Sequence, residues 1–160
     1  MSVVEEITTA NADYAREFDC GSLSAPPARR FALVTCMDAR LDPAKFCGLD
    51  EGDAHVIRNA GGLVNDETLR SLVISHHLLG TQEAIVIGHT GCGMLTFQNS
   101  DLYERLGPES ESIDFQPFDD LEGRVRESVD AIRESPLLPE SFGATGFVYD
   151  VESGALRPVT

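Results

Sequence analysis

The sequence predicts an α/β protein with a mainly parallel central β-sheet flanked by helices, an N-terminal helical arm and a C-terminal strand or hairpin. Three observations indicate this class: short apolar segments typical of buried strands, helical periodicity between them, and turn signals at their boundaries. A chain of 160 residues falls within the usual size of one domain. We therefore expect a single domain over residues 1–160, with an arm at 1–27 and a core at 28–160.

The front of the chain is expected to form a helix joined to the body by a linker. The segment 21–30 is linker-like because it contains Pro26 and Pro27. Short apolar segments after it predict buried strands of a parallel sheet. These segments are Phe31–Thr35, His55–Arg58 and Ala84–Gly88.

Two helices are expected to cover this sheet. Apolar residues recur at helical spacing from Leu69 to Leu79, after a cap at Asn65 or Asp66 and before a stop at Gly80. A second apolar face with the same spacing predicts a helix from about residue 119 to residue 134.

The end of the chain is expected to form a hairpin, with strands at 147–151 and 155–157 joined by a Glu-Ser-Gly turn. The segment 91–106 is expected to be helical only in part.

Charge and hydropathy exclude several classes of protein. The net charge of −15 argues against nucleic acid, because Lys and Arg are needed to neutralise phosphates. The sequence has no apolar run long enough to cross a membrane and no secretion signal near residue 1, so we expect a cytoplasmic protein without a membrane partner.

Lys45 is the only lysine beside eleven arginines. Such an acidic composition is similar to the surfaces of proteins from salt-loving organisms, and an ordinary acidic protein is the alternative.

The four cysteines divide into two groups. A cytoplasmic setting keeps thiols reduced and favours metal binding over disulfides. Cys36 and Cys92 lie in contexts typical of metal ligands, whereas Cys20 and Cys47 are expected to be ordinary packing residues.

Metal-binding side chains follow the ends of two predicted strands. Cys36 ends the first apolar segment, and His89 follows the third, with Cys92 three residues later. Zinc favours thiolate and imidazole ligands, and catalytic zinc commonly has three protein ligands and one exchangeable position. Because ligands collect at the carboxyl edge of an open α/β sheet, the three residues predict a zinc site there.

A carboxylate and a guanidinium accompany the first ligand. In Cys36-Met37-Asp38-Ala39-Arg40 the functional residues alternate, and alternate residues of an extended chain face the same side. We therefore expect Asp38 near the metal, with Arg40 keeping it ionised and directed. A surface ion pair is the alternative for these two residues.

Together these residues resemble the β-carbonic anhydrases, whose pattern is Cys-x-Asp-x-Arg followed later by His-x-x-Cys. The stretches 56–61, 87–94 and 135–139 look like the short prokaryotic type, and the resemblance covers residues 28–159. It implies one Zn²⁺ per subunit on Cys36, His89 and Cys92, which would promote the hydration of CO₂ to bicarbonate. It also implies a catalytic dyad of Asp38 and Arg40, with Asp38 becoming the fourth zinc ligand only in a closed state.

The resemblance further implies a homodimer or a larger homo-oligomer, with the N-terminal helix reaching the partner. No role is assigned to His55, His76 or His77, while Arg58 and Asn59 are expected to shape the pocket wall or a subunit contact. Two alternatives stay open. One is a zinc hydrolase of carbonyl sulfide or carbon disulfide on the same fold, and the other is a non-catalytic domain stabilised by zinc.

Overall fold

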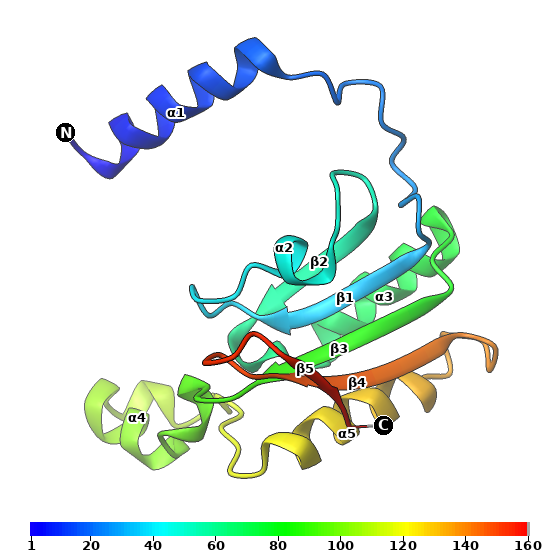
Figure 1. Ribbon diagram of the computed structural model, residues 1–160. Helices are drawn as coiled ribbons and strands as arrows, with labels where there is room; N and C mark the ends of the chain where they lie inside the picture. Colours follow the sequence, from blue (N-terminus) through cyan, green and yellow to red (C-terminus); the bar gives the residue numbers. More distant parts are fainter. Residues whose placement is uncertain (160) are drawn as a thin grey trace.

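A five-stranded β-sheet forms the centre of the molecule in the computed structural model, which describes residues 1–159 (Figure 1). The strand order is β2-β1-β3-β4-β5, and all neighbours are parallel except β4 and β5, which are antiparallel. The strands are β1 (Phe31–Cys36), β2 (Ala54–Asn59), β3 (Glu83–His89), β4 (Gly143–Tyr149) and β5 (Leu156–Pro158). The predicted fold class is therefore confirmed.

Within residues 1–159, five α-helices and three short 3₁₀ segments connect and cover the strands. The α-helices are α1 (Val3–Glu17), α2 (Pro43–Cys47), α3 (Asp66–Leu79), α4 (Asn99–Leu106) and α5 (Leu121–Arg133). The 3₁₀ segments are η1 (Ala60–Gly62), η2 (Gly93–Leu95) and η3 (Pro108–Ser110). Helix α3 has the predicted start and stop residues. The Asn65 side chain accepts a hydrogen bond from the backbone NH of Thr68, and Gly80 ends the helix in the left-handed conformation.

The two faces of the sheet are covered by different helices. One face packs against α3 through Leu72 and against α5 through Val129 and Ile132, all of which are fully buried or nearly so. The opposite face, which includes Leu33 of β1, packs against Phe46 of α2. Burial of these side chains is the main stabilising force of the core, and it fixes the positions of the strand ends.

Helix α1 extends away from the sheet and contributes no buried residue (Figure 1). Its exposed apolar side chains include Val3, Ile7 and Tyr14. The Tyr14 hydroxyl donates a 2.8 Å hydrogen bond to Glu51, which links the arm to the loop before β2. No helix among residues 1–159 is both long and apolar enough to cross a membrane.

Two elements differ from the sequence-based expectation. Strand β4 begins at Gly143 and ends at Tyr149, rather than spanning 147–151, and it pairs with β3 along its whole length before its antiparallel pairing with β5. The short helix α2 was not predicted. The helix begins after Asp42, whose side chain accepts a hydrogen bond from the backbone NH of Lys45. It ends at Gly48, which adopts the left-handed conformation.

Candidate metal centre

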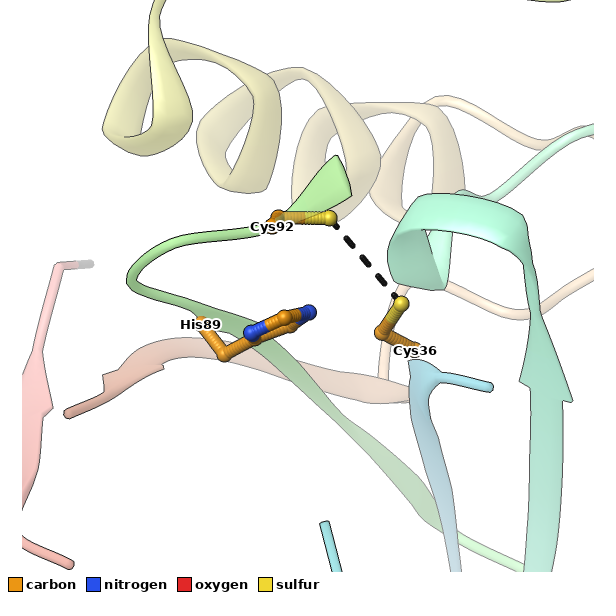
Figure 2. A group of neighbouring side chains, drawn as sticks. All are labelled: Cys36, His89 and Cys92. Carbon is orange, nitrogen blue, oxygen red and sulfur yellow. Dashed lines mark hydrogen bonds between the residues drawn. The ribbon is translucent and has the colours of Figure 1, made fainter. Parts of the chain in front are cut away.

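Three buried side chains converge at the carboxyl edge of the sheet. Cys36 is the last residue of β1 and His89 the last residue of β3, and these strands are parallel neighbours. Cys92 follows on the loop after β3. One potential ligand atom from each residue lies within 4.8 Å of the other two, and Figure 2 shows the side chains turned toward one another. The three residues predicted to bind zinc therefore lie together.

The histidine is oriented as a metal ligand requires. His89 Nδ1 donates a 3.0 Å hydrogen bond to the carbonyl of Thr90, so the free lone pair is on Nε2. Nε2 is buried and has no hydrogen-bond partner in the described part of the chain. A buried polar atom without a partner is costly, and a metal ion at this position would remove that cost.

The two sulfur atoms also fit a shared metal. Cys36 Sγ and Cys92 Sγ are 4.0 Å apart (Figure 2). Two thiolates bound to tetrahedral zinc at about 2.3 Å would lie about 3.8 Å apart. The hydrogen bond from Cys92 holds the pKa of the Cys36 thiol far below its ordinary value, and the same contact raises the pKa of Cys92. One thiolate is thus already favoured, and the donor set of two sulfurs and one imidazole suits Zn²⁺.

Asp38 and Arg40 form a two-point ion pair beside this cluster. Arg40 Nε donates a hydrogen bond to Asp38 Oδ1 at 2.9 Å, and Arg40 Nη2 donates one to Oδ2 at 2.7 Å. These bonds hold the pKa of the Asp38 carboxyl well below its usual range. Asp38 Oδ2 also lies 3.9 Å from His89 Nε2, so the ionised carboxylate is adjacent to the ligands.

Arg40 connects the dyad to the second ligand loop. Its Nη2 donates a 2.8 Å hydrogen bond to the carbonyl of Gly91, which lies between His89 and Cys92. Gly91 has a φ of 60°, a conformation that glycine adopts without strain. The guanidinium therefore joins the segment after β1 to the loop after β3.

A close backbone approach places Gly62 against the first ligand. A Cβ atom on Gly62 would lie 2.9 Å from the backbone nitrogen of Cys36, and the residue has a φ of 65°. Only glycine fits both conditions. The sequence alone does not indicate this role, because a Gly-Gly pair predicts a turn but not the segment that the turn approaches.

Apolar side chains surround the centre. Leu41 and Met94 are buried beside Cys36 and Cys92, and Phe97 and Phe118 pack against them. Such a wall limits the access of bulk water and strengthens electrostatic interactions at the site.

The other candidate residues lie outside the cluster. His55 Nδ1 is within hydrogen-bond distance of the Ser75 hydroxyl. His76 and His77 each donate a hydrogen bond to a backbone carbonyl. Cys20 and Cys47 are partly exposed free thiols that do not belong to the metal-ligating group.

Comparison with known proteins agrees with this geometry. The carbonic anhydrase family profile matches residues 31–109. The chain is 42% identical to beta-carbonic anhydrase 1 of Mycobacterium tuberculosis, over 100% of this chain and 99% of that protein. It matches the crystal structure of a carbonic anhydrase from Streptococcus mutans with a TM-score of 0.94 and 43% identity, over 100% of this chain and 99% of that one.

The chain is therefore a member of the carbonic anhydrases. Within that class it belongs to the β-carbonic anhydrase family, and the resemblance seen in the sequence is confirmed. A further relative is the carbon disulfide hydrolase of Acidithiobacillus thiooxidans, which is 31% identical over 85% of this chain and 80% of that protein.

Proposed function

We propose that this protein catalyses the reversible hydration of CO₂ to bicarbonate and a proton, with one Zn²⁺ per subunit. The observation that carries this proposal is the buried Cys36-His89-Cys92 cluster, with an ionised carboxylate at its edge. Membership in the β-carbonic anhydrase family supports it. When bound, zinc supplies Lewis acidity, which makes water a nucleophile near neutral pH.

In this proposal the dyad orients the reacting water. Asp38 is an ionised hydrogen-bond acceptor near neutral pH, because the hydrogen bonds from Arg40 lower its pKa. It accepts a hydrogen bond from the attacking water and so orients an oxygen lone pair toward CO₂. Arg40 fixes the direction of the carboxylate through two hydrogen bonds, and without that restraint Asp38 would become the fourth ligand of a closed state.

Replacing Asp38 by Asn tests this role against a non-catalytic zinc domain. We expect zinc to be retained and kcat/KM for CO₂ to fall about 100-fold, since an amide cannot replace the charged acceptor. Asp130→Asn, at an exposed site in α5, is the matched control and should keep full activity. Unchanged CO₂ hydration in the Asp38 variant would remove Asp38 from the mechanism, whereas zinc-loaded wild-type protein that hydrates no CO₂ would favour a structural zinc site.

Hydrolysis of carbonyl sulfide or carbon disulfide is the second candidate function. It is favoured by the similarity to the carbon disulfide hydrolase of Acidithiobacillus thiooxidans. The ligands do not distinguish the substrates, because access through the surrounding side chains decides which molecule enters. Both turnovers should be measured on one purified sample, and faster turnover of either sulfide than of CO₂ would replace our first choice.

We also propose that the functional unit is at least a homodimer to which α1 contributes. The apolar side chains of α1 include Val4, Ile7 and Tyr14, and none is buried within its own chain. A pocket of about 580 Å³ between α3 and the end of α5 is lined by Leu69, Val73 and other residues. We infer that these two apolar surfaces cover each other in the dimer, with α1 of one chain lying on the pocket of the other.

A charge on the apolar face of α1 should weaken this association. We expect Ile7→Glu to lower the mass measured by sedimentation toward that of one chain. Thr9→Glu adds the same charge on the opposite side of the helix and should leave the assembly intact. Equal masses for both variants would remove α1 from the interface.

Two broader expectations are part of the proposal. We retain a cytoplasmic location, which the four free cysteines support. We also retain one domain over residues 1–160, with the arm at 1–27 and the zinc-binding core at 28–160.

A further inference from the structure

Arg58, in the edge strand β2, makes two hydrogen bonds to the segment that carries the first ligand and the dyad. Its Nε donates a hydrogen bond to the carbonyl of Cys36 at 2.9 Å, and its Nη2 donates one to the carbonyl of Asp38 at 2.7 Å. In the β-sheet register Arg58 is opposite Thr35, one residue before Cys36. The guanidinium therefore spans the carbonyls on either side of Met37.

These two contacts control which way the side chains face. In an extended segment the carbonyls of residues i and i+2 point to the same side, and so do their side chains. Holding the carbonyls of Cys36 and Asp38 together therefore keeps the thiolate and the carboxylate on one face. Met37 contributes little packing to this segment, because its side chain is 66% exposed. Its backbone NH donates to Asn59 at 2.9 Å, the last ladder contact between the two strands.

We propose that Arg58 is a positioning residue that keeps Cys36 and Asp38 directed at the metal centre. This role rests on the proposed function, and it extends the machinery to a strand that carries neither a metal ligand nor the dyad. An arginine suits the task because its planar fork donates in two directions, whereas a lysine ammonium is a single point of charge on a flexible stem.

The test uses full-length protein loaded with Co²⁺ in place of zinc. Arg58→Met removes both hydrogen bonds, and Arg58→Lys retains a charge that reaches one carbonyl. Arg133→Met is the matched control, because Arg133 donates a 2.8 Å hydrogen bond to the carbonyl of Ala144, away from the centre. Co²⁺ affinity is measured by competition with a chelator, and the visible absorption spectrum reports the ligand geometry.

We expect Arg58→Met to weaken Co²⁺ binding about 10- to 100-fold and to change the absorption bands, because the hydrogen bonds that orient a metal ligand are lost. The Co²⁺ affinity of Arg58→Lys should lie between those of Arg58→Met and the wild type. Arg133→Met should keep the wild-type affinity and spectrum. The proposal is overturned if Arg58→Met matches Arg133→Met in both measurements. If Arg58→Met does not fold, wild-type affinity and spectrum in Arg58→Lys would overturn it equally. Wild-type protein that binds no Co²⁺ would reject the metal centre itself, a result distinct from failure of the Arg58 role alone.

Discussion

At the scale of single residues, our proposal assigns metal binding and the orientation of water to different side chains. Cys36, His89 and Cys92 supply soft donors, and the unpartnered Nε2 of His89 marks where a cation belongs. Asp38 is held ionised by Arg40 at the edge of this cluster. That these five residues lie together was predicted from the two motifs and the family resemblance that they carry. The roles of Arg58 and Gly62 were not, because they depend on contacts between segments far apart in the chain.

The Asp38-Arg40 pair should make the stability of the metal-free protein depend on pH. Arg40 lowers the folded-state pKa of Asp38, so the pair stabilises the fold above the unfolded-state pKa of about 3.9. This contribution is lost as the pH falls below that value toward the folded-state pKa. Arg40→Met should therefore be less stable than wild type in urea at pH 7 and pH 5, with a smaller difference at pH 3. A difference that grows on acidification would contradict this account.

At the scale of elements, parallel strand ends bring together ligands that are distant in sequence. Strands β1 and β3 were predicted because continuous apolar runs are typical of strands covered on both faces. The start of β4 was not predicted, because Gly143-Ala144-Thr145-Gly146 has small side chains and no strong β preference. Pairing with β3 overrides that weak local signal. Helix α2 was too short to produce a recognisable period.

The close approach of η1 to β1 leads to a prediction about Gly62. Gly62→Ala would place a Cβ 2.9 Å from the backbone of Cys36 at a positive φ, so the strand end must shift. We expect a loss of about 1–3 kcal/mol in the free energy of unfolding, with weaker metal binding. Gly93→Ala is the control, since a Cβ there meets nothing within 4 Å and the residue has no positive φ. Equal losses in the two variants would show that the approach of Gly62 is unimportant.

At the scale of the whole molecule, the dominant feature is the excess of negative charge. The net charge of −15 opposes the compact state through self-repulsion, and dissolved salt screens that repulsion. Because Lys45 is the only lysine and acidic residues are abundant, we propose adaptation to high ionic strength. An ordinary acidic protein remains the alternative.

Urea unfolding in low and in molar KCl distinguishes these two cases. We expect the unfolding midpoint to move to higher urea as salt increases, because the Debye length falls from about 10 Å at 0.1 M to about 3 Å at 1 M. The same comparison should be made on a carbonic anhydrase of near-neutral net charge. Stability that does not increase with salt would rule out the halophilic interpretation.

The account rests on one zinc ion held by Cys36, His89 and Cys92, and X-ray absorption at the zinc edge of purified protein tests this directly. It should give one zinc per chain, with two sulfur neighbours at about 2.3 Å and one imidazole nitrogen at about 2.0–2.1 Å. Protein without stoichiometric zinc, or a coordination shell that lacks sulfur, would contradict the central claim.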